Sequence, residues 1–389
     1  MQELMFLGLF VLALAIGWFL GRREAIKVGF MLKPHGSAVD RQYFIGLNYL
    51  LNEQPDEAIE TFIRALEVNP ETVETHIAIG KLFCQRGDVE RAIKVHQNLL
   101  ARPNLTALQA DRVQLELARD YLAVGMHQRA ERLLEALADS RSSLRAEALG
   151  DLVTVYEQQH EWRQAIATGR RLLREQPRFA VTLAQYHCEM AVVALASREF
   201  EQARSWLQAA LKVDAGCVRA LILLAELEER LGNLKALPGL LRRVAADSPD
   251  FVPEVLALAE RCADNGALNL ADYLDQALGQ ADSPPVRILL ARAQHMRRAE
   301  GREAAERFLL QHLERRPSLG GVLGLLRLGD ECDSETGVSA SRRLLETLQR
   351  ARPQYRCEHC GFSGIKLHWQ CPGCQQWSTV KPLKGHELT

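Results

Sequence analysis

Small and aromatic side chains alternate with polar ones at helical spacing in residues 39–72. The marked positions are Gly46, Tyr49, Ala58, Phe62, Ala65 and Pro70. Residues three and four apart lie on one face of a helix. The stretch therefore predicts two short helices whose small residues let the backbones approach, while the aromatic residues fill the remaining space. A proline follows the second helix, since proline does not continue one.

The same spacing returns along most of the chain. The small position of the second helix recurs at Ala58, Ala92, Ala130, Ala165, Ala203, Leu237, Ala271 and Ala305. Twelve residues before each lies another small or apolar residue: Gly46, Gly80, Ala118, Val153, Ala191, Ala225, Ala259 and Ala293. This pattern resembles the tetratricopeptide repeat, a pair of antiparallel helices that stacks into an array. We predict about eight such repeats over residues 39–317.

Turn residues support this division into helix pairs. Gly87, Gly232 and Gly266 lie between the two predicted helices of their units, where a chain reversal needs a permissive backbone. The alternative is an ordinary helical bundle, for which a constant phase is not expected. Residues 318–352 continue as one more, degenerate helix pair, with helices at 320–328 and 339–351, as is usual at the end of a repeat array.

Composition favours an all-α fold and a reducing compartment. Aromatic residues make up 6% of the chain, hydrophobic residues 47% and charged residues 25%, which suits helices more than strands. The net charge of −1 gives no reason to expect nucleic acid as a partner. Five cysteines are scattered singly, as buried thiols are in reduced proteins: Cys84, Cys188, Cys217, Cys262 and Cys332.

The N-terminus carries an uncharged apolar run at residues 4–20. As a helix it measures about 25 Å, slightly less than the roughly 30 Å hydrocarbon core of a bilayer. A cleaved signal peptide is the alternative. In this chain, however, Arg22 and Arg23 follow the apolar run, whereas a signal peptide has its positive charges first. We therefore expect residues 1–21 to be an uncleaved transmembrane anchor.

Basic residues after the anchor predict its orientation. The apolar run is followed by Arg22, Arg23, Lys27 and Lys33, whereas the one charged side chain before it is Glu3. Because positive residues stay on the cytoplasmic side, the bulk of the protein is expected there. Residues 22–38 then form a juxtamembrane segment and linker.

The C-terminal residues 353–389 carry two Cys-x-x-Cys pairs, Cys357 with Cys360 and Cys371 with Cys374. Two such pairs at short separation suit one tetrahedral ion, with zinc preferred and iron as the alternative. His359 and His368 are not needed as ligands. Four thiolates leave no open coordination position, which favours a structural ion over a catalytic one. So small a domain would need the ion in order to fold.

The repeats predict a groove lined by the first helix of each unit. Charged residues expected to face it and to bind a partner are Lys81, Arg119, Arg219, Glu226, Glu260 and Arg287. Their mixed signs suit a protein partner more than a polyanion, and an ordinary solvated helix face is the alternative. No nucleotide-binding loop, His-Glu-x-x-His or Gly-x-Ser-x-Gly motif occurs in the sequence. We therefore expect a protein that is not an enzyme.

The combination of anchor, repeats and four-cysteine ribbon resembles the lipopolysaccharide assembly protein B family over essentially the whole chain. The ribbon resembles a rubredoxin-type domain whose ligands map onto Cys357, Cys360, Cys371 and Cys374. In one departure, Gln375 follows the second pair in place of a glycine. Trp369 and Trp377 are expected to pack within the ribbon or against the last repeats.

The resemblance implies a single-pass inner-membrane adaptor that works with the FtsH protease. Members of this family promote degradation of the LpxC deacetylase and contact an inner-membrane lipopolysaccharide-sensing protein through the membrane segment. One alternative is a scaffold that gathers lipopolysaccharide assembly enzymes without delivering any to a protease. Another is a redox or nucleic-acid-binding ribbon. The resemblance also implies that the ribbon packs on the final repeats and fixes their curvature.

Overall fold

The computed structural model describes residues 45–46, 48–49, 61, 73–103, 105–280, 284–315, 318–329, 346 and 352–383. The predicted anchor at 4–20 and the linker at 22–38 lie outside these residues, as do most of the first repeat and of the helix expected at 339–351. The chain divides into two compact units, residues 1–145 and 146–389, which are described separately.

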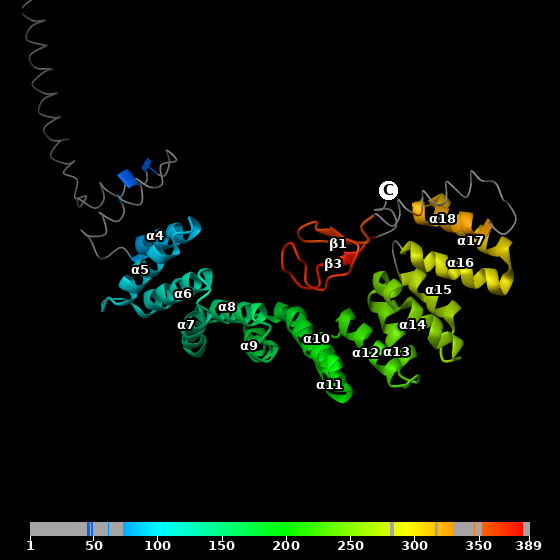
Figure 1. The fold of residues 1–389 in the computed structure, drawn as a ribbon, viewed down its shortest axis with the longest axis horizontal. Helices are drawn as coiled ribbons and strands as arrows, with labels where there is room; N and C mark the ends of the chain where they lie inside the picture. Colours follow the sequence, from blue (N-terminus) through cyan, green and yellow to red (C-terminus); the bar gives the residue numbers. More distant parts are fainter. Residues whose placement is uncertain are drawn as a thin grey trace, which may run out of the picture. The chain divides into compact units, whose positions relative to one another are not determined.

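The described part of the first unit is a series of antiparallel helices (Figure 1). They are α4 (Val73–Gln85), α5 (Val89–Leu100), α6 (Ala107–Ala123) and α7 (His127–Asp139). Each packs against the next in the chain. The side chain of Thr106 accepts a hydrogen bond from the backbone N–H of Gln109, and the backbone N–H of Thr106 donates to the side-chain oxygen of Gln109. This capping box fixes the start of α6.

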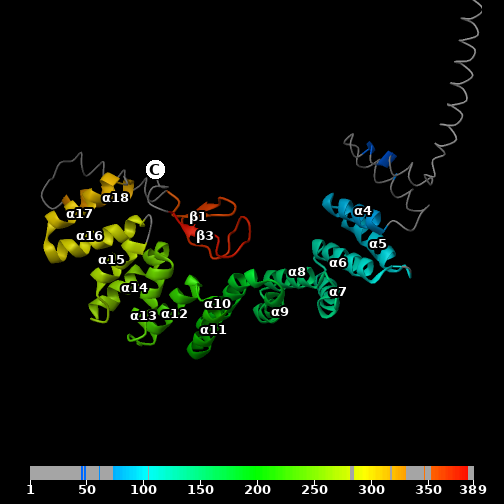
Figure 2. The same ribbon diagram turned by 180° about the vertical axis from the view of Figure 1, so that it is seen from behind.

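The second unit continues the helix pairs and ends in a small sheet (Figure 2). Its helices are α8 (Arg145–Gln158), α9 (Trp162–Glu175), η1 (Pro177–Phe179), α10 (Ala180–Ala196), α11 (Phe200–Val213), α12 (Val218–Arg230), α13 (Leu237–Asp247), η2 (Pro249–Phe251), α14 (Val252–Asp264), α15 (Leu270–Gln280), α16 (Val286–Glu300), α17 (Arg302–Arg315) and α18 (Leu319–Gly329). The helix α18 occupies the segment at 320–328 for which a terminal helix was predicted.

Reversals between paired helices share a residue with positive φ. A residue with positive φ, between 57° and 96°, stands at Gly87, Gly125, His160, Arg198, Gly232, Gly266 and Gly301. In most of these turns the residue after the one with positive φ donates its backbone N–H to the carbonyl of the residue five positions earlier. Examples are Asn233 to Glu228 at 2.9 Å and Glu161 to Tyr156 at 2.8 Å. This bond closes the helix end. His160 and Arg198 adopt the geometry without glycine, so the turn recurs even where the sequence lacks its usual signal.

Most of the residues that set the repeat phase are buried where helices cross, and Ala271 is half-buried. Ala92, Ala130, Ala165, Ala203 and Ala305 are completely buried, and Leu237 is 1% exposed. The second recurring position is buried in every described repeat, from Gly80 to Ala293. A larger side chain at these crossings would force the backbones apart, because helix interfaces are close-packed. The tetratricopeptide prediction and the all-α class of the main body are confirmed.

The C-terminal ribbon is a three-stranded antiparallel sheet in the order β2-β1-β3. Its strands are β1 (Tyr355–Cys357), β2 (Ser363–Gly364) and β3 (Val380–Pro382). Its buried residues are Tyr355, Cys357, Cys371 and Val380. A core of four residues, two of them cysteines, is too small to stabilise a domain by apolar burial alone.

One helical stretch in the described part of the chain, Pro177–Ala196, is long and apolar enough to cross a membrane. Half of it is buried inside the protein. Leu183, Tyr186 and Ala191 on α10 are completely buried among the repeats. This stretch therefore reads as an interior helix, and it does not replace the anchor predicted at residues 4–20.

Candidate metal centre and its contacts with the repeats

The four C-terminal cysteines form one cluster. The Sγ atoms of Cys357, Cys360, Cys371 and Cys374 all lie within 4.8 Å of one another. Cys357 and Cys374 are 3.7 Å apart, and Cys360 and Cys371 are 3.6 Å apart. Thiolates at about 2.3 Å from a tetrahedral zinc ion are separated by about 3.8 Å. The four cysteines therefore fit one metal ion, with every tetrahedral position taken by protein.

The two cysteine pairs have the same backbone geometry. The N–H of Gly361 donates to the carbonyl of Cys357 at 3.0 Å, and the N–H of Gln375 donates to the carbonyl of Cys371 at 2.8 Å. Gly361 has φ of 77° and Gln375 has φ of 57°. The second turn thus keeps the left-handed conformation even though its residue is not glycine. The missing glycine leaves the metal-binding geometry unchanged.

Hydrogen bonds favour the thiolate at Cys357. Burial opposes the charge, yet the hydrogen bond between Cys357 and Thr379 and those from the backbone N–H groups of Cys360 and His359 lower the pKa of the Cys357 thiol to about 6. At Cys360 the backbone N–H of Phe362 favours the thiolate. Burial and the neighbouring thiols outweigh it and raise the pKa of Cys360 to about 12. Four thiolates at this separation therefore need a cation between them.

The two histidines nearest the cluster are not part of it. His359 is exposed, and its Nε2 lies 3.4 Å from Nε2 of Gln376. His368 is half-buried and packs edge-on against Phe362, with ring centroids 6.1 Å apart. This arrangement agrees with the prediction that the cysteines alone hold the ion.

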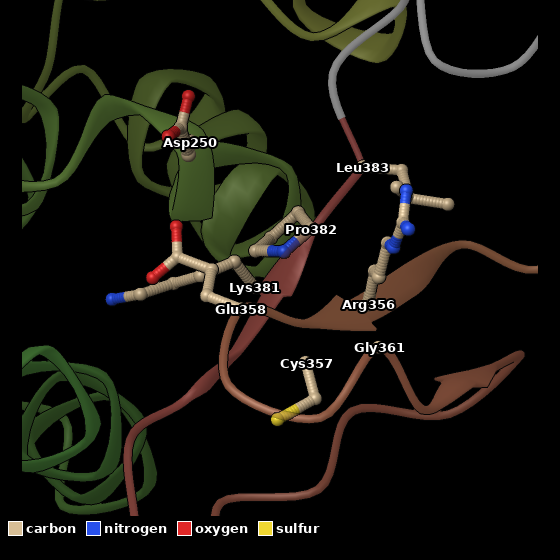
Figure 3. Close-up of a pocket in the computed structure, with 8 residues that line it drawn as sticks. All are labelled: Asp250, Arg356, Cys357, Glu358, Gly361, Lys381, Pro382 and Leu383. Atoms are coloured by element: carbon tan, nitrogen blue, oxygen red, sulfur yellow. The ribbon is translucent and has the colours of Figure 1, made fainter. Parts of the chain in front are cut away.

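A cavity of about 380 Å³ borders Cys357 (Figure 3). Its charged lining residues are Asp250 from η2 and Arg356, Glu358 and Lys381 from the ribbon. With two positive and two negative side chains, the lining of the cavity has no excess of either charge. This cavity therefore lacks the excess of positive charge that binding of a nucleic-acid backbone requires.

Glu157, near the end of α8, is the main polar contact between the repeats and the ribbon. Its Oε1 accepts hydrogen bonds from the indole N–H of Trp377 at 2.8 Å and from the Gln370 amide. Its Oε2 accepts from the hydroxyl of Tyr186 on α10. Hydrogen bonds to a charged acceptor are about twice as strong as neutral ones. One carboxylate thus joins two ribbon residues to two repeat helices.

Arg219 on α12 lies beneath the two ribbon tryptophans. Its guanidinium carbon is 5.8 Å from the ring centroid of Trp369 and 5.8 Å from that of Trp377. One guanidinium nitrogen donates to Glu189 at 2.8 Å. Trp369 also stacks on Phe251, with centroids 5.7 Å apart and planes 12° from parallel. Cation–π and stacking contacts of this kind each contribute about 0.5–1.5 kcal/mol.

A further contact ties the central strand of the ribbon sheet to the repeats. The hydroxyl of Tyr355 on β1 donates to Glu254 of α14 at 2.7 Å. Burial, followed by this bond, raises the pKa of the Tyr355 phenol. The ribbon therefore contacts α8, α10, α12, η2 and α14. Residues at the base of the ribbon also line a cavity with Val286 and Arg287 of α16, so the ribbon reaches the later repeats as well. That it fixes their curvature remains a prediction.

Comparison with known proteins accounts for both parts of the fold. A rubredoxin metal binding domain model matches residues 355–382, and a tetratricopeptide repeat model matches residues 45–103, 115–178 and 188–250. Lipopolysaccharide assembly protein B of Escherichia coli is 31% identical over 99% of both chains. The Haemophilus influenzae protein of the same name is 33% identical over the full length of both chains. This chain belongs to the lipopolysaccharide assembly protein B family.

Among solved structures, the crystal structure of MamA protein is 18% identical, with a TM-score of 0.36. The match covers 46% of this chain and 93% of the MamA chain. The assignment to the lipopolysaccharide assembly protein B family rests on the full-length relatives and does not depend on this match.

In the first unit of this family member, two predicted partner-binding residues share one anion. Lys81 on α4 and Arg119 on α6 each lie 3.0 Å from Oε1 of Glu116. The Glu116 side chain is 8% exposed, whereas those of Lys81 and Arg119 are 49% and 37% exposed. The buried carboxylate thus holds two partly exposed cations side by side. Partner binding by them remains a prediction.

The four predicted residues of the second unit differ in exposure. Arg219 is 7% exposed, and the ribbon covers it. Glu226 and Glu260 are exposed on α12 and α14. Arg287 on α16 lies 3.7 Å from Glu254. The position of Arg219 shows a contact within the chain, and the other three remain candidates for an external partner.

Sequence reasoning did not identify Glu157, Gln185 or Glu254 as contact residues. The repeat pattern could have indicated Gln185, because it lies 34 residues before Arg219 and so occupies the same position in the preceding repeat. Its amide donates to the hydroxyl of Ser378 at 2.9 Å. Glu157 and Glu254 carry no comparable signal, since a glutamate on a helix surface is ordinary.

Proposed function

We propose that this chain is a membrane-tethered, non-enzymatic adaptor that promotes degradation of the LpxC deacetylase by the FtsH protease, and so limits lipopolysaccharide synthesis. Support comes from the family, whose members in Escherichia coli and Haemophilus influenzae are named for lipopolysaccharide assembly. A tetratricopeptide array also offers the extended surface that a docking protein needs.

The observation that carries the proposal is the closed metal centre. Four cysteine sulfurs lie within 4.8 Å of one another, which leaves a tetrahedral ion no free position for a substrate. Trp377 and Tyr355 fix the same domain to the repeats through Glu157 and Glu254. A metal used in this way stabilises a docking surface. We propose zinc, and metal analysis of the purified chain distinguishes it from iron.

We propose that the partners bind charged residues of the repeats that remain exposed. Lys81 and Arg119 are held in place by Glu116, so they lose little side-chain entropy on binding. Glu226 and Glu260 provide the opposite sign. Mixed charge of this kind suits a folded protein as client.

The apolar run at residues 4–20 would hold the adaptor in the inner membrane, with its bulk on the cytoplasmic side. Confinement to the membrane of the protease raises the effective concentration of one for the other without any new contact. The same segment is the proposed contact with the lipopolysaccharide-sensing protein.

The half-life of the deacetylase in cells depleted of this chain tests the proposal. We expect the half-life to lengthen on depletion and to return when the intact chain is restored. A variant lacking residues 1–21, or one carrying Lys81→Glu and Arg119→Glu, should fail to restore it. Arg174→Glu is the matched control, because Arg174 is an exposed arginine on the second helix of its repeat, α9.

Two outcomes separate the alternatives. An unchanged half-life together with altered lipopolysaccharide would favour the scaffold that gathers assembly enzymes without proteolytic delivery. Iron in the purified chain with a reversible redox potential would favour an electron-transfer ribbon. Either result overturns the adaptor proposal.

A further inference from the structure

Two buried cysteines lie next to each other below the ribbon. Cys188 on α10 is completely buried, and Cys217, at the N-terminal cap of α12, is 3% exposed. Their Sγ atoms are 3.9 Å apart. A disulfide requires about 2.05 Å, so the sulfurs need to approach by about 1.9 Å. Rotation of the two side chains between staggered rotamers would have to supply this distance.

The two thiols have different environments. A hydrogen bond from Cys188 and one from the backbone N–H of Ala220 hold the pKa of Cys217 below its ordinary value, although burial and Asp214 oppose this effect. The bond to Cys217 and then burial raise the pKa of Cys188. Cys217 is therefore the better nucleophile of the pair, since the thiolate is the reactive form.

Cys217 also has the more accessible position. It lines a cavity of about 210 Å³ between the repeats and the ribbon, together with Gln185, Phe251, Trp369 and Ser378. Cys188 is not among the residues that line it. A small oxidant that enters this cavity therefore meets Cys217 first, and Cys188 lies directly behind it.

We propose that Cys188 and Cys217 form a redox-active thiol pair that hydrogen peroxide oxidises to a disulfide. The Cys217 thiolate attacks one peroxide oxygen, the O–O bond breaks, and the leaving hydroxide takes up a proton to give water. Cys217 is then a sulfenic acid. The Cys188 sulfur attacks it, the S–S bond forms, and hydroxide leaves with the Cys188 proton as a second water. The pair loses two electrons and the peroxide gains two.

The disulfide would act on the ribbon through Gln185. The Gln185 amide nitrogen donates to Sγ of Cys217 at 3.5 Å and to the hydroxyl of Ser378 at 2.9 Å. Its carbonyl oxygen lies 3.4 Å from a guanidinium nitrogen of Arg219. Movement of the Cys217 sulfur toward Cys188 removes one partner of that amide. Oxidation is therefore expected to weaken the contact between Gln185 and the ribbon.

Limited hydrogen peroxide treatment of the metal-loaded full chain tests the proposal. After alkylation of remaining thiols, peptide mass mapping should show residues 188 and 217 joined, with a loss of two hydrogens. Hydrogen exchange at the backbone of Ser378 should accelerate about fivefold, the loss of one hydrogen bond of ordinary strength. Metal release is followed in parallel, because peroxide also reacts with metal-bound thiolates.

Variants and other thiols of the chain provide the controls. In Cys188→Ser, dimedone should trap a sulfenic acid at Cys217, and exchange at Ser378 should stay at its untreated rate. Cys262, buried on α14, should stay reduced, and so should the half-buried Cys84. The proposal is overturned if Cys217 remains reduced at a dose that oxidises Cys84. It is also overturned if the ribbon releases its metal before residues 188 and 217 are joined.

Discussion

The indole N–H of Trp377 donates a hydrogen bond to Oε1 of Glu157 at 2.8 Å, across 220 residues of sequence. This bond connects the metal-bearing ribbon to α8, the first helix of the second unit. The same oxygen accepts from Gln370, and the other carboxylate oxygen accepts from Tyr186. The position of the ribbon on the repeats therefore depends strongly on one carboxylate.

Glu157→Gln should loosen the ribbon while leaving the repeats folded. The variant replaces one carboxylate oxygen of residue 157 by an NH₂ group, which donates and cannot accept. That NH₂ group would then face either the Trp377 and Gln370 donors or the Tyr186 hydroxyl. Hydrogen bonds to a charged group contribute about 1.5–3 kcal/mol. Because Glu157 is half-buried, we expect a loss of about 2 kcal/mol in the free energy of ribbon opening, measured by hydrogen exchange at Ser378.

The matched control is Glu161→Gln, which removes the same charge from an exposed residue just before α9. It should change the opening free energy by less than about 0.5 kcal/mol. Equal effects of the two substitutions would mean that net charge, and not the bond to Trp377, holds the ribbon in place.

His187 on α10 should make stability depend on pH below neutrality. It is completely buried beside the Trp206 ring. In the described part of the chain, neither of its ring nitrogens has a hydrogen-bond partner. Burial, with a smaller effect of Arg170, lowers the pKa of His187 to about 4. The unfolded chain takes up this proton near pH 6.5 and the folded chain only near pH 4. Stability is therefore lost as the pH falls through this window.

The expected loss is up to about 3 kcal/mol between pH 6.5 and pH 4. His187→Phe keeps a ring against Trp206 and cannot titrate, so its unfolding free energy should fall less over the same range. Urea unfolding of both proteins at a series of pH values measures the difference. Proton uptake by the ribbon cysteines affects both proteins alike. Parallel pH profiles would contradict this account, because they would show that His187 takes up its proton over the same pH range in the folded and unfolded chains.

Gly80→Ala should destabilise the first unit. A Cβ at Gly80 would lie 2.3 Å from Nε2 of His96. The imidazole of His96 has little room to move, because it is completely buried and its Nδ1 lies 2.5 Å from Asp120. Overpacking of this kind costs about 1–3 kcal/mol. Thermal unfolding should show the loss, and hydrogen exchange should place it in α4 and α5.

Gly239→Ala is the comparison for Gly80→Ala. A Cβ there meets no atom within 4 Å, and Gly239 is exposed inside α13. Alanine should therefore stabilise that helix by about 0.5–1 kcal/mol. Opposite signs for the two substitutions would support the steric explanation, and equal signs would contradict it.

The repeats and the cysteine cluster could be predicted because both depend on local spacing. Ala92 and Ala130 are completely buried at helix crossings, and only a small residue fits there, so the fold leaves a regular signal in the sequence. Cys357 and Cys360 are three residues apart, and the tight turn between them fixes their geometry. These features need no knowledge of distant contacts.

The position of the ribbon could not be predicted in this way. Tyr355 and Glu254 are 101 residues apart, and Gln185 and Ser378 are 193 apart. Each looks like an ordinary surface or loop residue in the sequence. Arg219 was expected to line an open groove and instead lies under the ribbon. A polar residue on an inward helix position serves an internal partner as readily as an external one, and the repeat pattern does not distinguish the two.

Hydrogen exchange of the full chain and its Cys371→Ser variant tests the central claim most directly. If the metal-bound ribbon is part of the folded repeat surface, the variant should lose protection in residues 352–383 and, to a smaller degree, in α8, α10, α12 and α14. Helices α4 to α7 should be unchanged, and most of the circular dichroism signal of the helices should remain. Unchanged exchange in α8 to α14, or collapse of the helical signal, would contradict the account.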